Sequence, residues 1–496
     1  MKYYWFKQAY LDSGWASGVT IAVADNGLIE SLEVDTLAGE FHSIDRAFDH
    51  PAIPGMPNIH SHAFQRAMAG LSEKISAASD TFWSWRKIMY EFAHQITPED
   101  LRAIAAQLYM EMLKSGYTSV AEFHYLHHQT SGQPYPNQAE LALAIIEGAA
   151  EAQVSLTILP VLYMSSDFGG APLKDEQKLF GNTVEEYQQL HRAIGEHIKS
   201  AQPSGPTVSL GAAFHSLRAV PPKAMAETLA YLDSVDPNMP IHIHIAEQVA
   251  EVEASMAWSG QRPVEWLLNN VAVDSRWCLI HATHINEDEI AGIVKSGATV
   301  GLCPTTEANL GDGFFPLGEF MGAALNSHLK ATLNFPFSSP FSSPLKSPIT
   351  GQGSIAIGSD SNTSVSPIEE LRLLEYGQRL LHRGRNLSAV PGSPHTGTRL
   401  YDAALEGGAK ATGRKVGKLA PGYSADILVL DSLSPDLFAK ASDDLLNGLI
   451  FSGNTNKVRD VMAAGHWVVE NFAHKNEAVI TERYRNTLAR LQGKPL

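Results

Sequence analysis

The sequence predicts an α/β protein: a (β/α)8 TIM-like barrel with a small β-sandwich domain built from both termini. Between residues 54 and 417, roughly eight β-like runs alternate with helical stretches, which is the pattern of a parallel barrel. The segments 1–53 and 418–496 are rich in β signal, and chain ends that lie close can build one domain together. Polar residues follow most barrel runs, where such a barrel carries its active site.

The terminal segments are typical of antiparallel strands. Residues 18–34, GVTIAVADNGLIESLEV, alternate in apolar character on both sides of an Asn-Gly turn signal, which predicts a hairpin. Residues 418–431, KLAPGYSADILVLD, end in a strong β run, and residues 458–470 give further β signal. We therefore expect a composite β-sandwich domain from 1–53 and 418–496, and a catalytic barrel from 54–417.

The barrel region combines short β-like runs with amphipathic helices. The segments 98–116 and 137–153 repeat apolar residues at helical spacing. A Ser/Pro-rich insertion at 335–348, FPFSSPFSSPLKSP, has too many prolines for a helix or a central strand, and we interpret it as a surface insertion. In order, the β-like runs occupy residues 52–62, 117–126, 154–164, 207–217, 240–247, 277–285, 297–306 and 354–362.

Charge and composition narrow the classes of partner. The net charge of −16 disfavours binding to nucleic acid or an anionic membrane, so an anionic substrate would require arginines gathered locally. No run approaches about 18 uninterrupted apolar residues, and the cytoplasm is the expected compartment. Cys278 and Cys303 are the only cysteines and form no Cys-x-x-Cys pair, so we expect neither a disulfide framework nor a thiolate zinc site.

Two histidines, His60 and His62, end the first barrel run. On a strand, residues two apart lie on one face, about 6.5–7 Å apart at the backbone, so both imidazoles can reach one cation. This pair alone is a weak signal. Together with His244, His281 and Asp360 at the ends of three other runs, it predicts a divalent metal site, with Zn²⁺ as the first choice and Fe²⁺ as the second.

The fifth run offers two histidines, His242 and His244, on the same face. We expect His244 to be the ligand, because it lies nearer the carboxyl-terminal rim and is followed three residues later by Glu247, which could act on a water at the metal. His242 is expected deeper in the barrel, as a hydrogen-bonded core histidine.

These features resemble the amidohydrolase superfamily over nearly the whole chain apart from 335–348. The resemblance is carried by PGMPNIHSH, by the His-x-x-Glu pair at 244–247, by His281, by Asp360 and by PGYSADILVLD. Members with two metals bridge them through a modified lysine, commonly at the end of strand four. The run at 207–217 has no lysine there and offers His215. The resemblance therefore implies one divalent metal ion per chain, held by His60, His62, His244 and Asp360, as in the mononuclear deaminase branch.

Within that branch, NIHSHAFQRAMAG, TFWSWRKIMY, SVAEFHYLHH and AAFHSLRAV most resemble the formimidoylglutamate deiminase family of histidine breakdown. The resemblance implies hydrolysis of N-formimidoyl-L-glutamate to N-formyl-L-glutamate and ammonia. It implies that Glu247, His281 and Asp360 are catalytic, and a homodimer is expected because barrels of this kind often pair. The implied substrate-binding residues are Gln65, Arg86, Tyr125, His215 and Arg218; Arg86 and Arg218 would hold the carboxylates, and the other three would add hydrogen bonds.

Other interpretations remain open at this point. Arg218 could form a salt bridge at the barrel rim, and Arg86 could be exposed or stacked on a neighbouring tryptophan. Arg66 projects differently from Gln65 and is the weaker candidate for binding substrate. The substrate could instead be another small amidine or a nucleobase-like ring, which would call for aromatic stacking more than arginines. A non-catalytic binding barrel would lack a bound metal.

Overall fold

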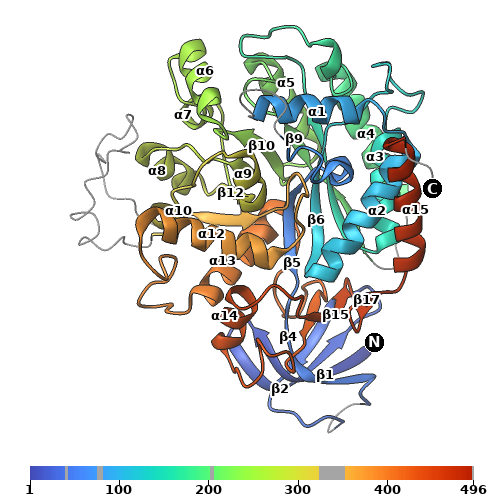
Figure 1. Cartoon of the computed structure of the whole chain (residues 1–496), viewed down its shortest axis with the longest axis vertical. Coiled ribbons are helices and arrows are strands. Elements are labelled where there is room, and N and C mark those ends of the chain that lie inside the picture. The colour runs from blue at the N-terminus through green and yellow to red at the C-terminus, as the bar shows by residue number, and fades with distance from the viewer. Residues whose placement is uncertain (40–42, 75–81, 201–205, 323–351, 494–496) are drawn as a thin grey trace.

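The computed structural model describes residues 1–39, 43–74, 82–200, 206–322 and 352–493. Two sheets organise the chain: a parallel barrel sheet, and below it in Figure 1 a second, mostly antiparallel sheet to which both ends of the chain contribute. The predicted fold class is confirmed. The predicted insertion at 335–348 lies outside the described residues. The domain boundaries and the homodimer stay predictions.

The barrel sheet runs in the order β13-β12-β11-β10-β9-β7-β6-β5, and each neighbouring pair is parallel. Its ends meet where the Asp360 amide donates to the His60 carbonyl and the His62 amide donates to the Asp360 carbonyl, both at 2.9 Å. The strands are β5 (Met56–Ser61), β6 (Tyr117–His124), β7 (Ser155–Leu162), β8 (Val208–Leu210), β9 (Ala212–Phe214), β10 (Ile241–Ile245), β11 (Trp277–His281), β12 (Thr299–Leu302) and β13 (Ser354–Ile357).

The fourth predicted run is divided in the structure. Both β8 and β9 pair with β7, and Gly211 lies between them. A Cβ atom at Gly211 would lie 2.4 Å from the Leu159 side chain and 3.0 Å from Pro240, so only glycine fits this close approach. The bend lets β9 pair with β10 and carries the chain on to His215 and Arg218.

Helices surround the barrel, as Figure 1 shows. The predicted helix at 98–116 is α2 (Pro98–Ser115), which begins with a capping box from Thr97 and ends at Gly116 in the left-handed conformation. The others around the barrel are α1 (Phe82–Ala93), α3 (Glu140–Ala152), α4 (Val184–Ser200), α5 (Pro222–Val235), α6 (Val249–Ser259), α7 (Pro263–Asn270), α8 (Glu287–Ser296), α9 (Pro304–Leu310), α10 (Leu317–Phe320), α12 (Pro367–His382) and α13 (Thr396–Thr412).

The second sheet joins the two ends of the chain side by side, in the order β17-β16-β15-β14-β4-β1-β2-β3. Strand β4 pairs in parallel with β1 and antiparallel with β14, so an amino-terminal strand lies against a carboxyl-terminal one. The predicted hairpin at 18–34 is the β2–β3 pair. The strands are β1 (Lys2–Leu11), β2 (Gly14–Val23), β3 (Ile29–Glu33), β4 (Arg46–Pro54), β14 (Ile427–Leu430), β15 (Val458–Ala463), β16 (His466–Glu470) and β17 (Ala473–His474), followed by α15 (Glu477–Leu491).

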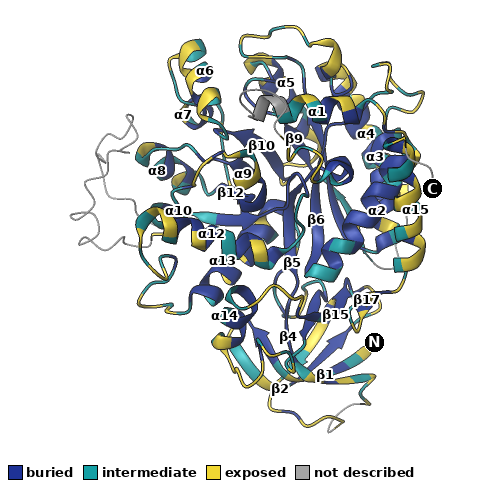
Figure 2. Cartoon of the chain, viewed as in Figure 1, coloured by how far each residue is buried: buried dark blue, intermediate teal, exposed yellow. Residues whose placement is uncertain are grey.

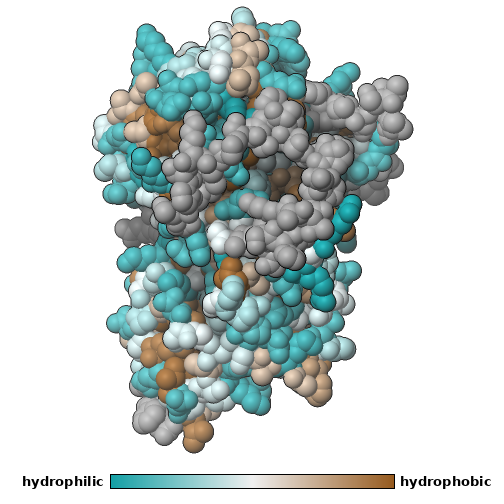
Figure 3. Space-filling model, turned by 90° about the vertical axis from the view of Figure 1, so that its left-hand side faces the viewer, coloured by the Kyte–Doolittle hydropathy of each residue, from teal (hydrophilic) through white to brown (hydrophobic). Residues whose placement is uncertain are grey.

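Burial follows this architecture. The barrel strands are buried, whereas the surrounding helices expose their outer faces, as Figure 2 shows. Among the coloured residues on the face shown in Figure 3, hydrophilic ones predominate, and the visible hydrophobic ones gather in small groups. Among the described helices, none combines the length and apolar character needed to cross a membrane.

Candidate active site

Four side chains converge where the barrel closes. The ligand atoms of His60, His62, His244 and Asp360 all lie within 4.8 Å of one another, and all four residues are buried. The His60 Nε2 atom lies 3.0 Å from His244 Nε2 and 3.4 Å from Asp360 Oδ1, and His62 Nε2 lies 3.2 Å from the same oxygen. The structure thus brings together the four residues predicted to bind the metal.

The donor atoms of this cluster suit a divalent cation. The Nδ1 atoms of His62 and His244 face the backbone carbonyls of Phe123 and His215, each at 3.0 Å. A carbonyl only accepts, so Nδ1 carries the proton and Nε2 directs its lone pair into the cluster. Burial lowers the pKa of His60 to about 3, which keeps that imidazole neutral. Three neutral imidazoles and a carboxylate fit Zn²⁺ or Fe²⁺.

A second group of polar residues surrounds His281. Its Nε2 atom lies 3.6 Å from Asp360 Oδ2 and 3.7 Å from Glu247 Oε1, and its Nδ1 atom lies 3.3 Å from Glu307 Oε1. Burial would lower the pKa of His281, but the three surrounding carboxylates raise it well above its ordinary value. Burial raises the pKa of Glu247 to about 7, so this carboxyl group can exchange a proton near neutral pH.

Two further carboxyl groups complete this region, and the sequence analysis did not single them out. Glu307, in α9, also accepts from the Cys303 amide at 2.9 Å, which fixes it beside His281. Asp312 accepts a hydrogen bond from Gln248, and burial raises the pKa of Asp312 to about 9. Glu307 follows a barrel strand closely, so the rule that located the other site residues could have found it.

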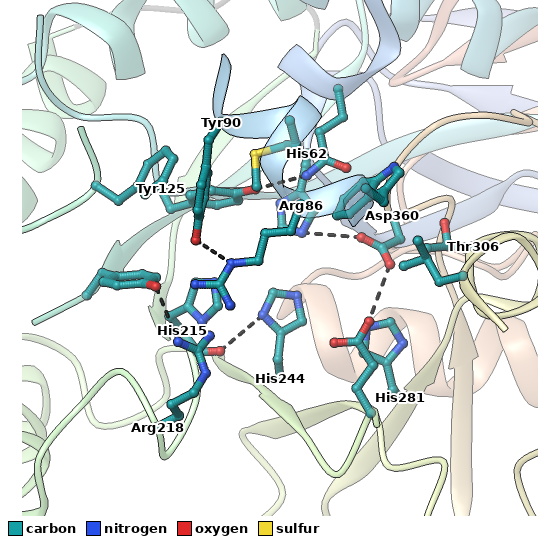
Figure 4. A pocket seen from close by; sticks show the side chains of 17 residues that line it. His62, Arg86, Tyr90, Tyr125, His215, Arg218, His244, His281, Thr306 and Asp360 are labelled. Atoms are coloured by element: carbon teal, nitrogen blue, oxygen red, sulfur yellow. Dashed lines mark hydrogen bonds and ion pairs between the residues drawn. The ribbon is translucent and has the colours of Figure 1, made fainter. Parts of the chain in front are cut away.

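The predicted substrate-binding residues line the same cavity, which is about 70 Å³ in volume and adjoins a larger one of about 720 Å³. Gln65 donates to the Tyr125 hydroxyl at 2.9 Å, and the buried amide oxygen of Gln65 has no partner among the described residues. Figure 4 shows Arg86 and Arg218 reaching toward His215 from two sides. Burial and the charges of both arginines lower the pKa of His215, so this ring is neutral.

Arg218 forms no ion pair with a carboxylate in the described part of the chain, although the charge of Glu251 lies close enough to raise the pKa of Arg218. One guanidinium nitrogen donates to the Ser166 carbonyl at 2.8 Å and to the Tyr163 hydroxyl at 3.5 Å. Both acceptors are neutral. The buried guanidinium group of Arg218 therefore has donors that could bind an anion at lower desolvation cost than an exposed arginine.

Two residues weighed in the sequence lie apart from the cavity. His242 is buried in the barrel, where its Nε2 atom lies 2.7 Å from the Ala411 carbonyl oxygen. Arg66 pairs with Glu111 at 2.8 Å and donates to the Asn362 carbonyl at 3.0 Å. Its guanidinium therefore holds the loop after β13 against α2.

The backbone around the cluster is strained. His281, at the end of β11, has φ = +69°, and Asp360, after β13, has φ = +47°. Ala246, after β10, has φ = +52°. Such conformations are unfavourable for residues other than glycine and persist only where the surrounding structure enforces them, which is common at active sites. Here His281 is the last residue of β11, and Ala246 and Asp360 lie just after β10 and β13.

Fold and site together define a hydrolase of the amidohydrolase family. This chain belongs to that family, whose model matches residues 52–468. Formimidoylglutamate deiminase from Pseudomonas aeruginosa is 45% identical over 471 residues, which are 95% of each chain. The crystal structure of an amidohydrolase from Brucella melitensis is 41% identical, with a TM-score of 0.85 over 99% of this chain and 100% of the other. An adenosine deaminase structure from Xanthomonas campestris with bound zinc, 21% identical, shares the fold with a TM-score of 0.74 over 99% of this chain and 98% of the other.

Proposed function

We propose that this chain hydrolyses a C–N bond of N-formimidoyl-L-glutamate, releasing ammonia and leaving N-formyl-L-glutamate. The observation that carries the proposal is the 45% identity to the Pseudomonas aeruginosa formimidoylglutamate deiminase across 95% of both chains. The cavity supports it, because one side presents the His/Asp cluster and the other presents two arginines. A substrate with an amidine at one end and two carboxylates at the other matches both sides.

The arginines provide binding and orientation. Arg86 and Arg218 each offer a planar set of donors that can hold a carboxylate through two parallel hydrogen bonds. His215 and Tyr125 add donors between the arginines and the cluster. The unpartnered amide oxygen of Gln65 can accept from a formimidoyl N–H group. Holding the reacting carbon in one place can contribute several kcal/mol to the rate.

The residues on the other side of the cavity accept and donate protons during the reaction. When bound by His60, His62, His244 and Asp360, a divalent metal ion lowers the pKa of water toward ~7 and supplies a nucleophile at neutral pH. Asp360 Oδ2 can accept the proton of the attacking water. Glu247 donates a proton to the imino nitrogen, so that ammonia leaves rather than an amide anion. His281, cationic among its carboxylates, stabilises negative charge that develops at the attacking oxygen.

The test is release of ammonia from N-formimidoyl-L-glutamate by the zinc-loaded protein. Replacing Glu247 with Gln removes the proton donor and is expected to lower kcat by about 10²–10⁴-fold. Glu253→Gln, at an exposed position of the following helix α6, is the matched control and is expected to leave kcat unchanged. A folded, zinc-loaded wild type that releases no ammonia would sink the proposal, and full activity in Glu247→Gln would remove Glu247 from the mechanism.

A further inference from the structure

Gln177 is a fully buried glutamine at the end of the short 3-10 helix η2 (Asp175–Gln177), in the segment between β7 and α4. Its amide oxygen accepts from the Lys174 backbone N–H at 3.0 Å, which fixes the orientation of the side chain. Its Nε2 atom therefore faces two tyrosine hydroxyls: it donates to Tyr163 at 2.9 Å and to Tyr90 at 3.4 Å. All the polar atoms of this side chain are satisfied inside the protein.

Each of these tyrosines contacts one of the two arginines. Arg86, one helical turn before Tyr90 in α1, donates its Nε–H to the Tyr90 hydroxyl. Arg218 donates to the Tyr163 hydroxyl at 3.5 Å. A continuous chain of hydrogen bonds thus runs from Arg86 through Tyr90, Gln177 and Tyr163 to Arg218. Tyr90, Tyr163 and both arginines line the cavity, whereas Gln177 does not.

This arrangement leaves the hydroxyl hydrogens of Tyr90 and Tyr163 available as further donors. Each tyrosine oxygen already accepts one hydrogen bond from Gln177 and one from an arginine, so its own O–H hydrogen points elsewhere. Burial raises the pKa of Tyr90 to about 12, and its hydroxyl therefore keeps its proton. Each arginine is accordingly accompanied by a tyrosine hydroxyl that can donate to the same carboxylate.

The chain also fixes the distance between two positive charges. Arg86 and Arg218 repel each other, and the charges of both reach His215. Arg218 is held in addition by the Ser166 carbonyl at 2.8 Å. With both tied through tyrosines to one rigid amide, their separation is set before a ligand binds, and a preorganised site loses less entropy on binding.

We propose that Gln177 is a specificity-determining positioning residue, which sets the spacing of the two arginines and thereby selects a dicarboxylate of glutamate length. The inference rests on the proposed function for the identity of the substrate. The part of the inference that concerns binding of a dicarboxylate is independent of the proposed function. Gln177 does not line the cavity, and its side chain hydrogen-bonds to Lys174, Tyr90 and Tyr163, so it acts through the two tyrosines.

The binding test uses glutarate, succinate and butyrate, titrated calorimetrically into the zinc-loaded protein. The wild type is expected to bind glutarate at least about tenfold more tightly than succinate, and butyrate weakly. Gln177→Met keeps the side-chain volume and removes the three hydrogen bonds. It is expected to weaken glutarate binding by about 10–100-fold and to erase the preference over succinate, while butyrate binding stays the same. Gln189→Met, exposed on α4, is the matched control.

The kinetic test separates positioning from general damage. With formimidoylglutamate, Gln177→Met is expected to raise KM by about 10–100-fold and to change kcat by less than about threefold, because the arginines bind and do not react. If Gln177→Met does not fold, Tyr163→Phe removes one link of the chain with little change in volume and is expected to shift KM in the same direction.

The outcomes distinguish this inference from the proposed function. Unchanged glutarate preference in both Gln177→Met and Tyr163→Phe would overturn the inference, and so would a wild type that binds glutarate and succinate equally. A wild type that prefers glutarate, loses the preference in the variants and yet releases no ammonia from formimidoylglutamate would support the inference and reject the proposed function.

Discussion

Gly358 offers a sharp test of how the barrel closes around the metal ligands. It lies between the end of β13 and Asp360, packed directly on β5. A Cβ atom at this position would lie 2.8 Å from the backbone nitrogen, the carbonyl oxygen and the Cβ of His60. Non-bonded carbon atoms prefer about 3.5–4.0 Å, so Gly358→Ala must move the two strands apart by roughly 0.7–1.2 Å.

That displacement separates ligands that belong to different strands. His60 Nε2 and Asp360 Oδ1 are 3.4 Å apart and must both reach one cation, whereas metal–ligand distances tolerate only about 0.2 Å. Overpacking of this kind costs about 1–3 kcal/mol. Because moving β13 away from β5 relieves the overlap at the expense of the ligand geometry, we expect Gly358→Ala to bind zinc about 10–100-fold more weakly.

The assay is zinc competition with a chromophoric chelator, together with thermal unfolding with and without the metal. The increase in Tm on zinc binding is expected to shrink in Gly358→Ala, since weaker binding stabilises the folded state less. Gly392→Ala is the matched control, because a Cβ there meets no atom within 4 Å. Wild-type zinc affinity in Gly358→Ala would refute the claim that contact between β5 and β13 holds the ligand set together.

Three further predictions address substrate binding, pH and the metal. Arg218→Gln is expected to raise KM by at least about 30-fold by removing a buried cation, whereas Arg66→Gln, whose guanidinium pairs with Glu111, leaves KM within about threefold; equal effects in steady-state kinetics would contradict the assignment. Burial raises the pKa of Asp426 to about 6, compared with about 3.9 when unfolded, so the folded state holds more protons between these values. The free energy of unfolding therefore falls by about 2 kcal/mol as the pH rises from about 4 to about 6. Asp426→Asn is expected to lack this fall in denaturant titrations at the two pH values, and an unchanged pH dependence would show that another group is responsible. Dialysis against a chelator is expected to abolish ammonia release and lower Tm, and stoichiometric zinc to restore both; activity that persists in metal-free protein would exclude the metal from the reaction.

The sequence analysis predicted those site residues that lie at the ends of barrel strands. His60, His62, His244 and Asp360 each belong to a β-like run or follow one closely, and parallel strands bring such ends to one face. The same rule could have identified Tyr163 as a site residue, because it directly follows β7. It was missed because a tyrosine after an apolar strand usually indicates packing.

Other parts of the site could not be predicted from local pattern. Gln177 lies well beyond β7 in a segment without periodicity, and its importance comes only from the two tyrosines that the fold brings to it. The left-handed backbone conformation of His281 and Asp360 could not be predicted either, because tertiary contacts impose it on two residue types that disfavour a positive φ. The division of the fourth run depended on the space around Gly211 rather than on its neighbours in sequence.

The position of β4 in the second sheet has a consequence for synthesis of the chain. This strand emerges early from the ribosome, but its partner β14 follows about 370 residues later. At typical elongation rates of about 5–20 residues per second, one edge of β4 waits roughly 20–75 s for its partner. During that interval β1 to β4 form an incomplete sheet with an open edge, which is the arrangement most prone to pair with a neighbouring nascent chain. The second sheet can therefore be completed only after β14 has been synthesised. A chain that ends before β14 leaves that edge of β4 exposed permanently.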